Sequence, residues 1–175
     1  GMGRTGKLFA HQHFNVTPDI MTLAKALANG LPIGAMLATE KVAQAFVPGS
    51  HASTFGGTPL VTAAALEVTK VMDEMEVPAR AAETGSHIKD RLAELADRFE
   101  VIKEVRGLGL MIGIELRVAA APIVEMCMAR GFFINAVQEN TIRLIPPLII
   151  GPASVDAFVD CLFEIFEEME KGKGA

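Results

Sequence analysis

The stretch DIMTLAKALANGLPIGAMLATE, residues 19–40, contains one charged residue, Lys25, between the acidic residues at its two ends. The pair Asn29-Gly30 predicts a turn in its middle. The apolar run 33–39 is short enough to predict a buried strand. The segment before the turn therefore places Lys25 near the end of a strand or a helix.

Lys25 is a candidate nucleophile because an ammonium group in apolar surroundings loses hydration. Such burial lowers the pKa of an amine and makes it usable near neutral pH. The commonest use of an activated lysine is carbonyl chemistry through a Schiff base. The alternative is a lysine whose stem lies along the core while its amine reaches water. Residue type alone leaves both interpretations open.

Two helices are predicted after this stretch. Thr58 suits the N-cap of the first, and Pro59 suits its first helical position. Pro78 ends the first helix and precedes the second. The expected apolar face of the first helix is formed by Leu60, Ala64, Val68, Val71, Met72 and Met75, and that of the second by Ile88, Leu92, Leu95 and Phe99.

Beyond residue 100 the spacing of apolar residues changes, and every second residue is apolar. Residues 108–116 predict a half-buried strand, with residues 101–105 as its hairpin partner and the turn at Arg106-Gly107. Further elements are a helix over 122–130, strands over 132–136 and 141–145, and a last helix with Val155, Phe158, Leu162, Ile165 or Phe166, and Met169 inward, ending in a Lys/Gly tail. Residues 77–175 thus predict a small α+β domain with an antiparallel sheet. Residues 1–76 predict an incomplete part of a larger α/β domain that ends in a long linking helix.

The composition limits the classes of function. Half of the 175 residues are apolar, which suffices for a packed core, and the net charge of −5 with scattered basic residues argues against a nucleic-acid surface. No apolar run reaches membrane-spanning length, and no signal peptide is evident. Cys127 and Cys161 lie in apolar stretches, which predicts buried, reduced thiols and a cytoplasmic protein.

Two motifs near the N-terminus resemble binding motifs, for a dinucleotide and for a metal ion, but their surroundings do not support either kind of site. Residues 1–6, GMGRTG, match the pattern G-x-G-x-x-G, but dinucleotide binding needs a strand before it and a helix that opens at the third glycine. Neither is expected, so an oxidoreductase is a distant alternative. His11 and His13 lack a nearby cluster of further ligands, so no metal site is expected.

Two other positions carry binding chemistry. In residues 49–57, GSHASTFGG, small residues allow close backbone approach to an anion, and Ser53 and Thr54 supply hydroxyl donors for a phosphate. The alternative is an ordinary loop. Arg143 lies in an apolar strand, where a guanidinium binds a carboxylate as a bidentate fork. Its alternative is a pair with a structural glutamate.

Five blocks in sequence order together resemble one family. The first four are GMGRTGKLF at 1–9, residues 18–27 around Lys25, GLPIGAM at 30–36 and GSHASTFGG at 49–57. The fifth is the tail, which contains GLGLMIGIE at 107–115 and INAVQENTIRLIPPL at 134–148. The chain resembles the second half of class III pyridoxal-phosphate-dependent aminotransferases from about residue 1 to 168. Its tail is most similar to the acetylornithine branch. The resemblance implies the end of a fold type I large domain followed by a small domain.

The resemblance also implies residue roles and a cofactor, pyridoxal 5′-phosphate. Lys25 would bind the cofactor covalently and act as base and acid. Thr54 would contact the cofactor phosphate of the partner in a homodimer, while Ser53 and Arg143 would serve the substrate. The family usually has glycine and asparagine where this chain has Ala52 and Thr58, which puts the detail of the loop in doubt but leaves both hydroxyls.

The reaction that the resemblance implies is transfer of the terminal amino group of N-acetylornithine to 2-oxoglutarate, in arginine biosynthesis. Another ω-amino donor, ornithine or 4-aminobutyrate, is an alternative. The family takes the acidic partner of the ring nitrogen, the main phosphate loop and the stacking aromatic residue from upstream sequence. The isolated chain is therefore expected to be inactive, and a non-catalytic module that only associates is the other alternative.

Overall fold

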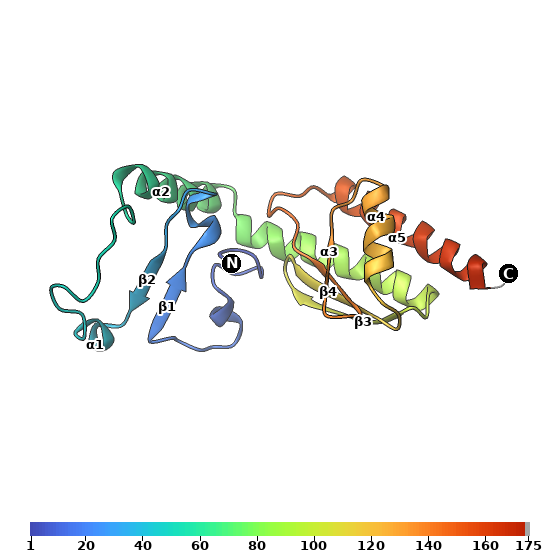
Figure 1. Cartoon of the computed structure of the whole chain (residues 1–175), viewed down its shortest axis with the longest axis horizontal. Coiled ribbons are helices and arrows are strands. Elements are labelled where there is room, and N and C mark those ends of the chain that lie inside the picture. Colours follow the sequence, from blue (N-terminus) through green and yellow to red (C-terminus); the bar gives the residue numbers. More distant parts are fainter. Residues whose placement is uncertain (174–175) are drawn as a thin grey trace.

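The computed structural model describes residues 1–173 and shows an elongated molecule with two groups of elements side by side (Figure 1). The first group contains η1 (Ala10–His13), β1 (Ile20–Leu23), η2 (Lys25–Ala28), β2 (Ala35–Ala38), α1 (Glu40–Ala43) and α2 (Pro59–Glu74). The second contains α3 (Val77–Arg98), β3 (Ile102–Leu108), β4 (Met111–Leu116), α4 (Ala121–Ala129), β5 (Asn135–Val137), β6 (Thr141–Leu144) and α5 (Pro152–Lys173). Residues 174–175 of the predicted tail lie outside the described residues.

The first group is built on an antiparallel pair of strands, β1 and β2, with Ile20 opposite Ala38. Asn29, with φ 48°, closes η2 in the predicted turn. The prediction of a strand within 33–39 is confirmed, but the prediction that it is buried is wrong. Met36 and Leu37 are 45% and 47% exposed, because β1 is the only strand paired with β2 among residues 1–173.

Helix α2 begins as predicted, with Thr58 at the N-cap and Pro59 in its first turn. The predicted apolar face is wrong in part, since Leu60 is 71% exposed whereas Val61 and Met72 are buried. Val71 and Met75 of that predicted face are exposed as well. Apolar residues surround most of this helix, so their spacing does not select one face; packing against η2 does.

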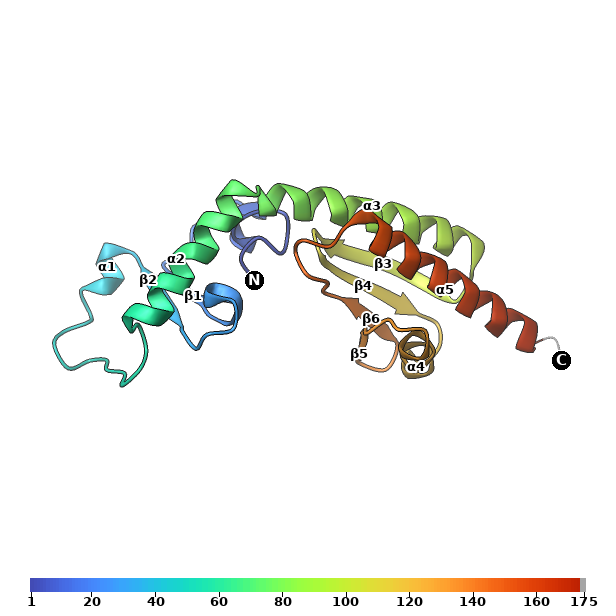
Figure 2. The ribbon, with the colours of Figure 1, turned by 90° about the horizontal axis from the view of Figure 1, so that it is seen from above.

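The second group has a four-stranded antiparallel sheet in the order β3-β4-β6-β5. Helices α3 and α5 pack against each other along one face of this sheet (Figure 2), and α4 packs on α5 and β5. The predicted face of α3 is confirmed, because its four apolar residues all lie in the core. The core contribution of α5 consists of Val155, Val159, Cys161, Leu162, Ile165 and Phe166.

The hairpin of β3 and β4 is confirmed, but its turn is not where the sequence predicts it. Arg106 and Gly107 lie inside β3, and the chain turns at Gly109-Leu110. A Cβ on Gly109 would lie 2.5 Å from the carbonyl carbon of Thr5, so a contact with the N-terminal loop decides the position of the turn. The amide of Leu110 donates to the carbonyl of Arg4 at 2.8 Å in the same contact.

Several smaller predictions can be compared with the structure. Cys127 and Cys161 are buried free thiols, as expected. The first helical element after the glycine-rich start is η1 at Ala10, and no helix opens at Gly6, so the dinucleotide-binding alternative is wrong. Within residues 1–173, no helix is both long enough and apolar enough to cross a membrane.

Candidate active site

Lys25 occupies the junction between β1 and η2, as the sequence predicts. Its backbone φ is +56°, in the left-handed region, while Ala24 before it is extended with φ −161° and ψ −162°. A residue with a Cβ loses roughly 1–3 kcal/mol in such a conformation. Asn15, Asn29, Glu76 and Gln138 share this left-handed conformation, so the strain at Lys25 sets the direction in which its side chain leaves the backbone and does not by itself assign a role.

The side chain of Lys25 borders an open cavity of about 500 Å³ with Asn29, Gly30 and Pro32 in its wall. The amine makes no hydrogen bond or ion pair with any other described residue. Lys25 is exposed, so the burial expected from its sequence neighbours is absent, although Ala26, Leu31 and Ile33 line the cavity beside it. The wrong expectation has a physical reason: Met36 and Leu37 of β2, which were expected to be buried, are exposed as well.

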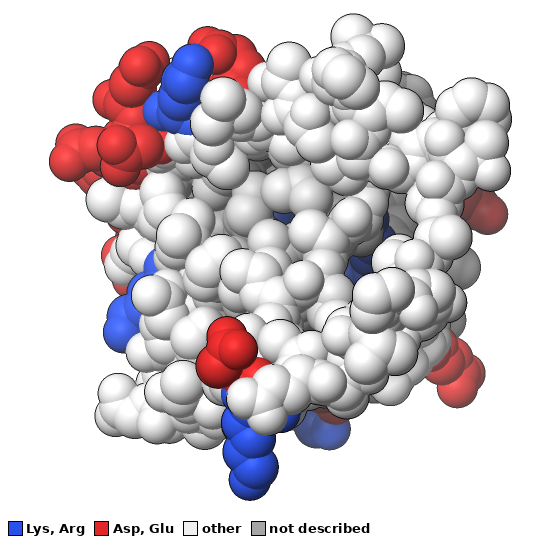
Figure 3. All heavy atoms as spheres, turned by 90° about the vertical axis from the view of Figure 1, so that its left-hand side faces the viewer, with Lys and Arg blue, Asp and Glu red and all other residues white. Residues whose placement is uncertain are grey.

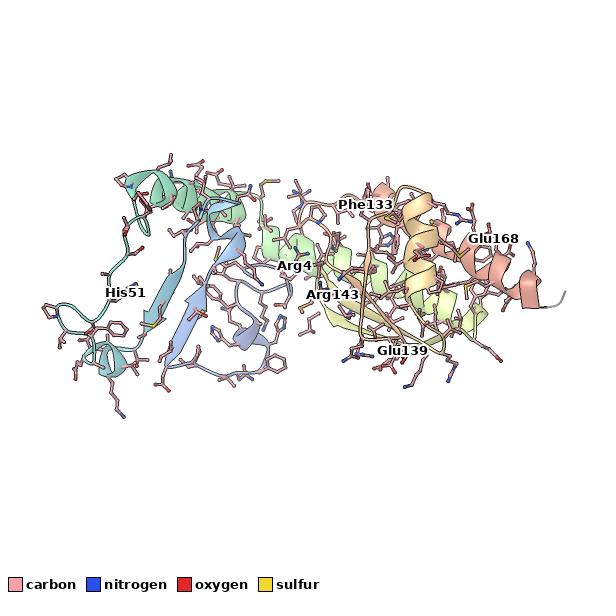
Figure 4. The ribbon with its side chains drawn as sticks, in the orientation of Figure 1. Arg4, His51, Phe133, Glu139, Arg143 and Glu168 are labelled. Atoms are coloured by element: carbon pink, nitrogen blue, oxygen red, sulfur yellow. The ribbon has the colours of Figure 1, made fainter. Side chains whose placement is uncertain are left out.

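The loop that contains Ser53 and Thr54 is exposed and closed by its own contacts. The Ser53 hydroxyl accepts a hydrogen bond from the amide of Gly56 at 2.8 Å. Neither hydroxyl residue lines the cavity beside Lys25. Figure 4 shows His51, from the same loop, at the end of the molecule remote from Arg143. Within one copy of the chain, the predicted phosphate loop and Lys25 therefore do not form one site.

Arg143 projects from β6, and its Nε atom is buried without a hydrogen-bond partner in the described structure. The other half-buried arginines, Arg4, Arg91 and Arg130, all have partners. The predicted alternative, in which Arg143 pairs with a structural glutamate, is thus wrong for residues 1–173. An unpaired buried donor is costly, commonly about 1–3 kcal/mol. The guanidinium is therefore available to an anion from outside the described chain.

A cavity of about 470 Å³ lies beside Arg143, where β5, β6 and the start of α5 come together. Most of its wall is apolar, with Phe132, Phe133 and Phe158 among its largest side chains. Phe133 is 88% exposed and, with Arg143, is labelled in Figure 4. Arg143 borders this apolar wall and also a second cavity of about 390 Å³ that Arg106 and Thr141 line. An unpaired guanidinium beside apolar side chains suits a carboxylate on a short aliphatic chain.

Arg4 is a structural residue that sequence reasoning did not single out. Its guanidinium donates to the carbonyl of Leu110 at 3.1 Å and to that of Pro146. Burial lowers the pKa of Arg4 from its ordinary value. Pro146 follows β6 closely, so Arg4 fixes the N-terminal loop against the strand that carries Arg143 (Figure 4).

No group of three His, Cys, Asp or Glu residues in the described structure is arranged to hold a metal ion. The two histidines near the N-terminus have other contacts. The His11 ring bonds to the carbonyl of Val16 at 2.8 Å, and the His13 ring bonds to the Thr5 hydroxyl at 3.0 Å. Both rings thus stabilise the N-terminal loop.

The residues around Lys25 meet some of the requirements of a cofactor that carries an aldehyde. Covalent attachment needs an unpaired amine beside open space, and Lys25 meets that requirement. A pyridine ring also needs an acidic partner for its nitrogen. The residues that line this cavity include no carboxylate in the described chain. They fit the attachment point of such a cofactor rather than its complete site.

Comparison with known proteins assigns the class of protein. Residues 1–166 match the family described as Aminotransferase class-III. The chain belongs to this family, whose cofactor is pyridoxal 5′-phosphate. The predicted family is therefore confirmed.

Individual relatives refine the comparison. The chain is 45% identical over 171 residues to a Methanocaldococcus jannaschii protein named acetylornithine aminotransferase, with 98% of this chain and 43% of the relative covered. A solved acetylornithine aminotransferase from Elizabethkingia anophelis matches with a TM-score of 0.89 at 32% identity, over 96% of this chain and 43% of that structure. An ornithine aminotransferase from Toxoplasma gondii matches with a TM-score of 0.92 at 32% identity, over 100% of this chain and 42% of that structure. The likeness confirms the predicted fold class, and the chain spans less than half the length of these relatives.

Proposed function

We propose that this chain provides the lysine-bearing part of a cytoplasmic enzyme of arginine biosynthesis that transfers the terminal amino group of N-acetylornithine to 2-oxoglutarate. The observation that carries the proposal is the amine of Lys25, which is held on a strained backbone beside an open cavity and has no partner among the described residues. The name of the Methanocaldococcus jannaschii relative supports this amino donor. Residues 1–76 would belong to the cofactor domain and residues 77–175 to a small domain.

Lys25 has two tasks in this proposal. Pyridoxal phosphate, when bound, supplies an aldehyde that captures amines and a ring that stabilises negative charge on the neighbouring carbon. Lys25 Nζ holds the cofactor at rest. Once the amino donor displaces it, the free amine would accept, as a base, the proton from the carbon that bears the amino group and would then donate that proton as an acid, so that Lys25 Nζ carries it between the two steps. The backbone at the start of η2, directly after β1, would keep the amine near that carbon.

Arg143 would orient the acidic substrate. A carboxylate accepts two parallel hydrogen bonds from one guanidinium, which fixes its direction as well as its position. The apolar wall beside Arg143 excludes water from part of that pair and strengthens it.

Thr54 and Ser53 would act across a homodimer. Both lie in an exposed loop away from Lys25 of their own chain, which suits hydroxyls that reach a neighbouring copy. Thr54 would donate to the cofactor phosphate of the partner, and Ser53 would lie beside the substrate.

Reductive labelling tests the role of Lys25. The chain is incubated with pyridoxal phosphate, reduced with borohydride, digested and mapped by mass spectrometry. We expect the adduct on Lys25 and its loss in Lys25→Ala, with Lys41→Ala, an exposed lysine of α1, as the matched control. Adduct formation mainly at Lys41 or another lysine would contradict the assignment.

The amino donor needs a separate test. A chimaera in which this chain continues the N-terminal part of the Methanocaldococcus jannaschii relative can be assayed with acetylornithine, ornithine and 4-aminobutyrate. We expect the largest kcat/KM for acetylornithine. Preference for 4-aminobutyrate or ornithine would refute that substrate and leave the role of Lys25 standing.

A second candidate role, association without catalysis, is favoured by the exposed apolar side chains of the first group. Figure 3 shows this end of the molecule, where uncharged residues predominate and most charged side chains lie toward the edges. Large side chains exposed there include Met36, Leu37, Phe46, Val47 and Phe55. An apolar surface of this kind promotes association. Sedimentation that shows only monomer across a wide concentration range would count against it.

A further inference from the structure

Arg143 has a single side chain directly beside it across the described sheet. In the register of the antiparallel strands, Asn135 of β5 lies opposite Arg143 on one side, and Gly113 of β4 lies opposite it on the other. Opposite residues in such strands project from the same face, with Cβ atoms about 4.5–5.5 Å apart. Gly113 has no side chain, so Asn135 is the direct neighbour of the Arg143 guanidinium.

The nearest acidic residue on this face is already engaged. Glu115 lies two residues along β4 from Gly113, opposite Thr141. Its carboxylate accepts hydrogen bonds from Lys103 at 2.5 Å and from Arg106 at 2.6 Å. These two cations satisfy Glu115, which leaves Arg143 as a positive charge beside an uncharged amide.

The Asn135 amide is free to take part in binding. It is half-buried, makes no side-chain hydrogen bond to another residue of 1–173, and lines the same 470 Å³ cavity as Arg143. A carboxylate offers about four acceptor positions, of which a guanidinium occupies two. The Asn135 Nδ2 group carries two N–H donors, and its place opposite Arg143 in the sheet brings them near a group that the guanidinium holds.

We propose that Asn135 and Arg143 together form a carboxylate-binding pair, in which the Asn135 amide donates a hydrogen bond to the same carboxylate that the Arg143 guanidinium holds. An uncharged residue is required at position 135, because an aspartate would pair with Arg143 and displace the ligand. The inference rests on the proposed function, in which Arg143 serves an acidic substrate. It adds Asn135 as a residue that determines specificity for a charged ligand.

The test uses glutarate, a dicarboxylate probe, and the Nε–Hε signals of arginines in a ¹H–¹⁵N NMR spectrum of the 175-residue chain. The Arg143 signal is identified by its absence in Arg143→Lys. In the unsubstituted chain we expect glutarate to shift this signal, whereas the neutral analogue glutaramide leaves it in place. Asn135→Ala should raise the Kd for glutarate roughly fivefold, the effect of one hydrogen bond. Gln138→Ala, an exposed change on the same hairpin, should leave the Kd unchanged.

Asn135→Asp gives a second, ligand-free readout. The new carboxylate should shift the Arg143 signal before glutarate is added and should weaken glutarate binding by more than Asn135→Ala does. A Kd within twofold of the unsubstituted chain in Asn135→Ala, or an unshifted Arg143 signal in Asn135→Asp, would overturn the role of Asn135 alone. Failure of glutarate to perturb Arg143 in the unsubstituted chain would overturn the proposed role of Arg143 and this inference with it.

Discussion

Replacement of Gly85 by alanine should destabilise this protein, although the same change stabilises most helices. Gly85 lies inside α3, where alanine is normally favoured over glycine by about 0.5–1 kcal/mol. Here a Cβ on Gly85 would lie 2.1 Å from the carbonyl oxygen of Gly109 and 2.4 Å from its carbonyl carbon. Both are backbone atoms at the turn between β3 and β4, so no side chain can rotate away.

The size of the effect follows from how far the backbone must move. Ordinary contact with a Cβ begins at 3.4 Å, so the Gly109 turn has to retreat from α3 by more than an ångström. Behind it lies the N-terminal loop: a Cβ on Gly109 would come within 2.5 Å of the Thr5 carbonyl carbon, and Leu110 bonds to the Arg4 carbonyl, so there is little room for that retreat. Overpacking of a tight contact costs about 1–3 kcal/mol, and we place this site at the upper end. After subtraction of the helical gain, the free energy of unfolding should fall by about 2 kcal/mol.

Urea denaturation followed by circular dichroism measures this change. Gly113→Ala is the matched control, because its Cβ would meet only the Thr141 methyl group at 3.7 Å and the Arg106 side chain and carbonyl at 3.9 and 4.0 Å. We expect the control to lie within about 0.5 kcal/mol of the unsubstituted chain. A Gly85→Ala variant as stable as the unsubstituted chain, or more stable, would refute the reasoning about this contact.

Three further predictions concern charge, thiol reactivity and activity. Hydrogen bonds from Lys103 and Arg106 lower the pKa of Glu115, so its stabilising contribution should be present above its unfolded pKa of about 4.3 and lost as the pH falls through the folded value. The urea midpoints of Glu115→Gln and the unsubstituted chain should therefore differ at pH 7, and the difference should shrink as the pH falls below about 4.3. A difference that stays constant would contradict this. Burial and the adjacent thiol of Cys161 raise the pKa of Cys127 to about 12, so a disulfide reagent at pH 8 should label it only after unfolding, and rapid labelling of the folded chain would refute this. The isolated chain with added pyridoxal phosphate should show no saturable transamination, because no carboxylate lines the described cavity beside Lys25; saturable activity that Lys25→Ala abolishes would show otherwise.

Helices that have one apolar face and one polar face could be predicted from the sequence, together with the side that they bury. The faces of α3 and α5 have a single apolar stripe, and local residues such as Thr58-Pro59 and Asn29-Gly30 mark their own caps and turns. The turn at Gly109 could not be predicted, because it depends on contacts with Gly85 and the N-terminal loop that are remote in sequence. The buried face of α2 was missed for the same reason, since packing rather than periodicity selects it.

The sequence predicts which residues belong to the candidate site, but it predicts their backbone conformation and their neighbours in space less well. The position of Lys25 at the end of β1 follows from the turn signals around it, whereas its left-handed backbone has no local sequence signal. Asn135 could not be found from the sequence, because its relation to Arg143 depends on strand register. A slip of one residue would place it on the opposite face of the sheet.

Lys25 and Arg143 line different cavities of this chain, but both lack a partner where other charged side chains have one. Arg4 donates hydrogen bonds to backbone carbonyls, and Arg130 donates to the carboxylate of Glu168. Arg91 forms ion pairs with Asp156 and Asp160 of α5. These half-buried arginines are therefore paired within the chain. Arg143, in contrast, has no partner among residues 1–173, and its unpaired buried Nε lowers the stability of the fold. Lys25 likewise occupies a strained conformation without a bonded partner there. A bound ligand commonly offsets costs of this kind, so both features support the roles proposed above for Lys25 and Arg143.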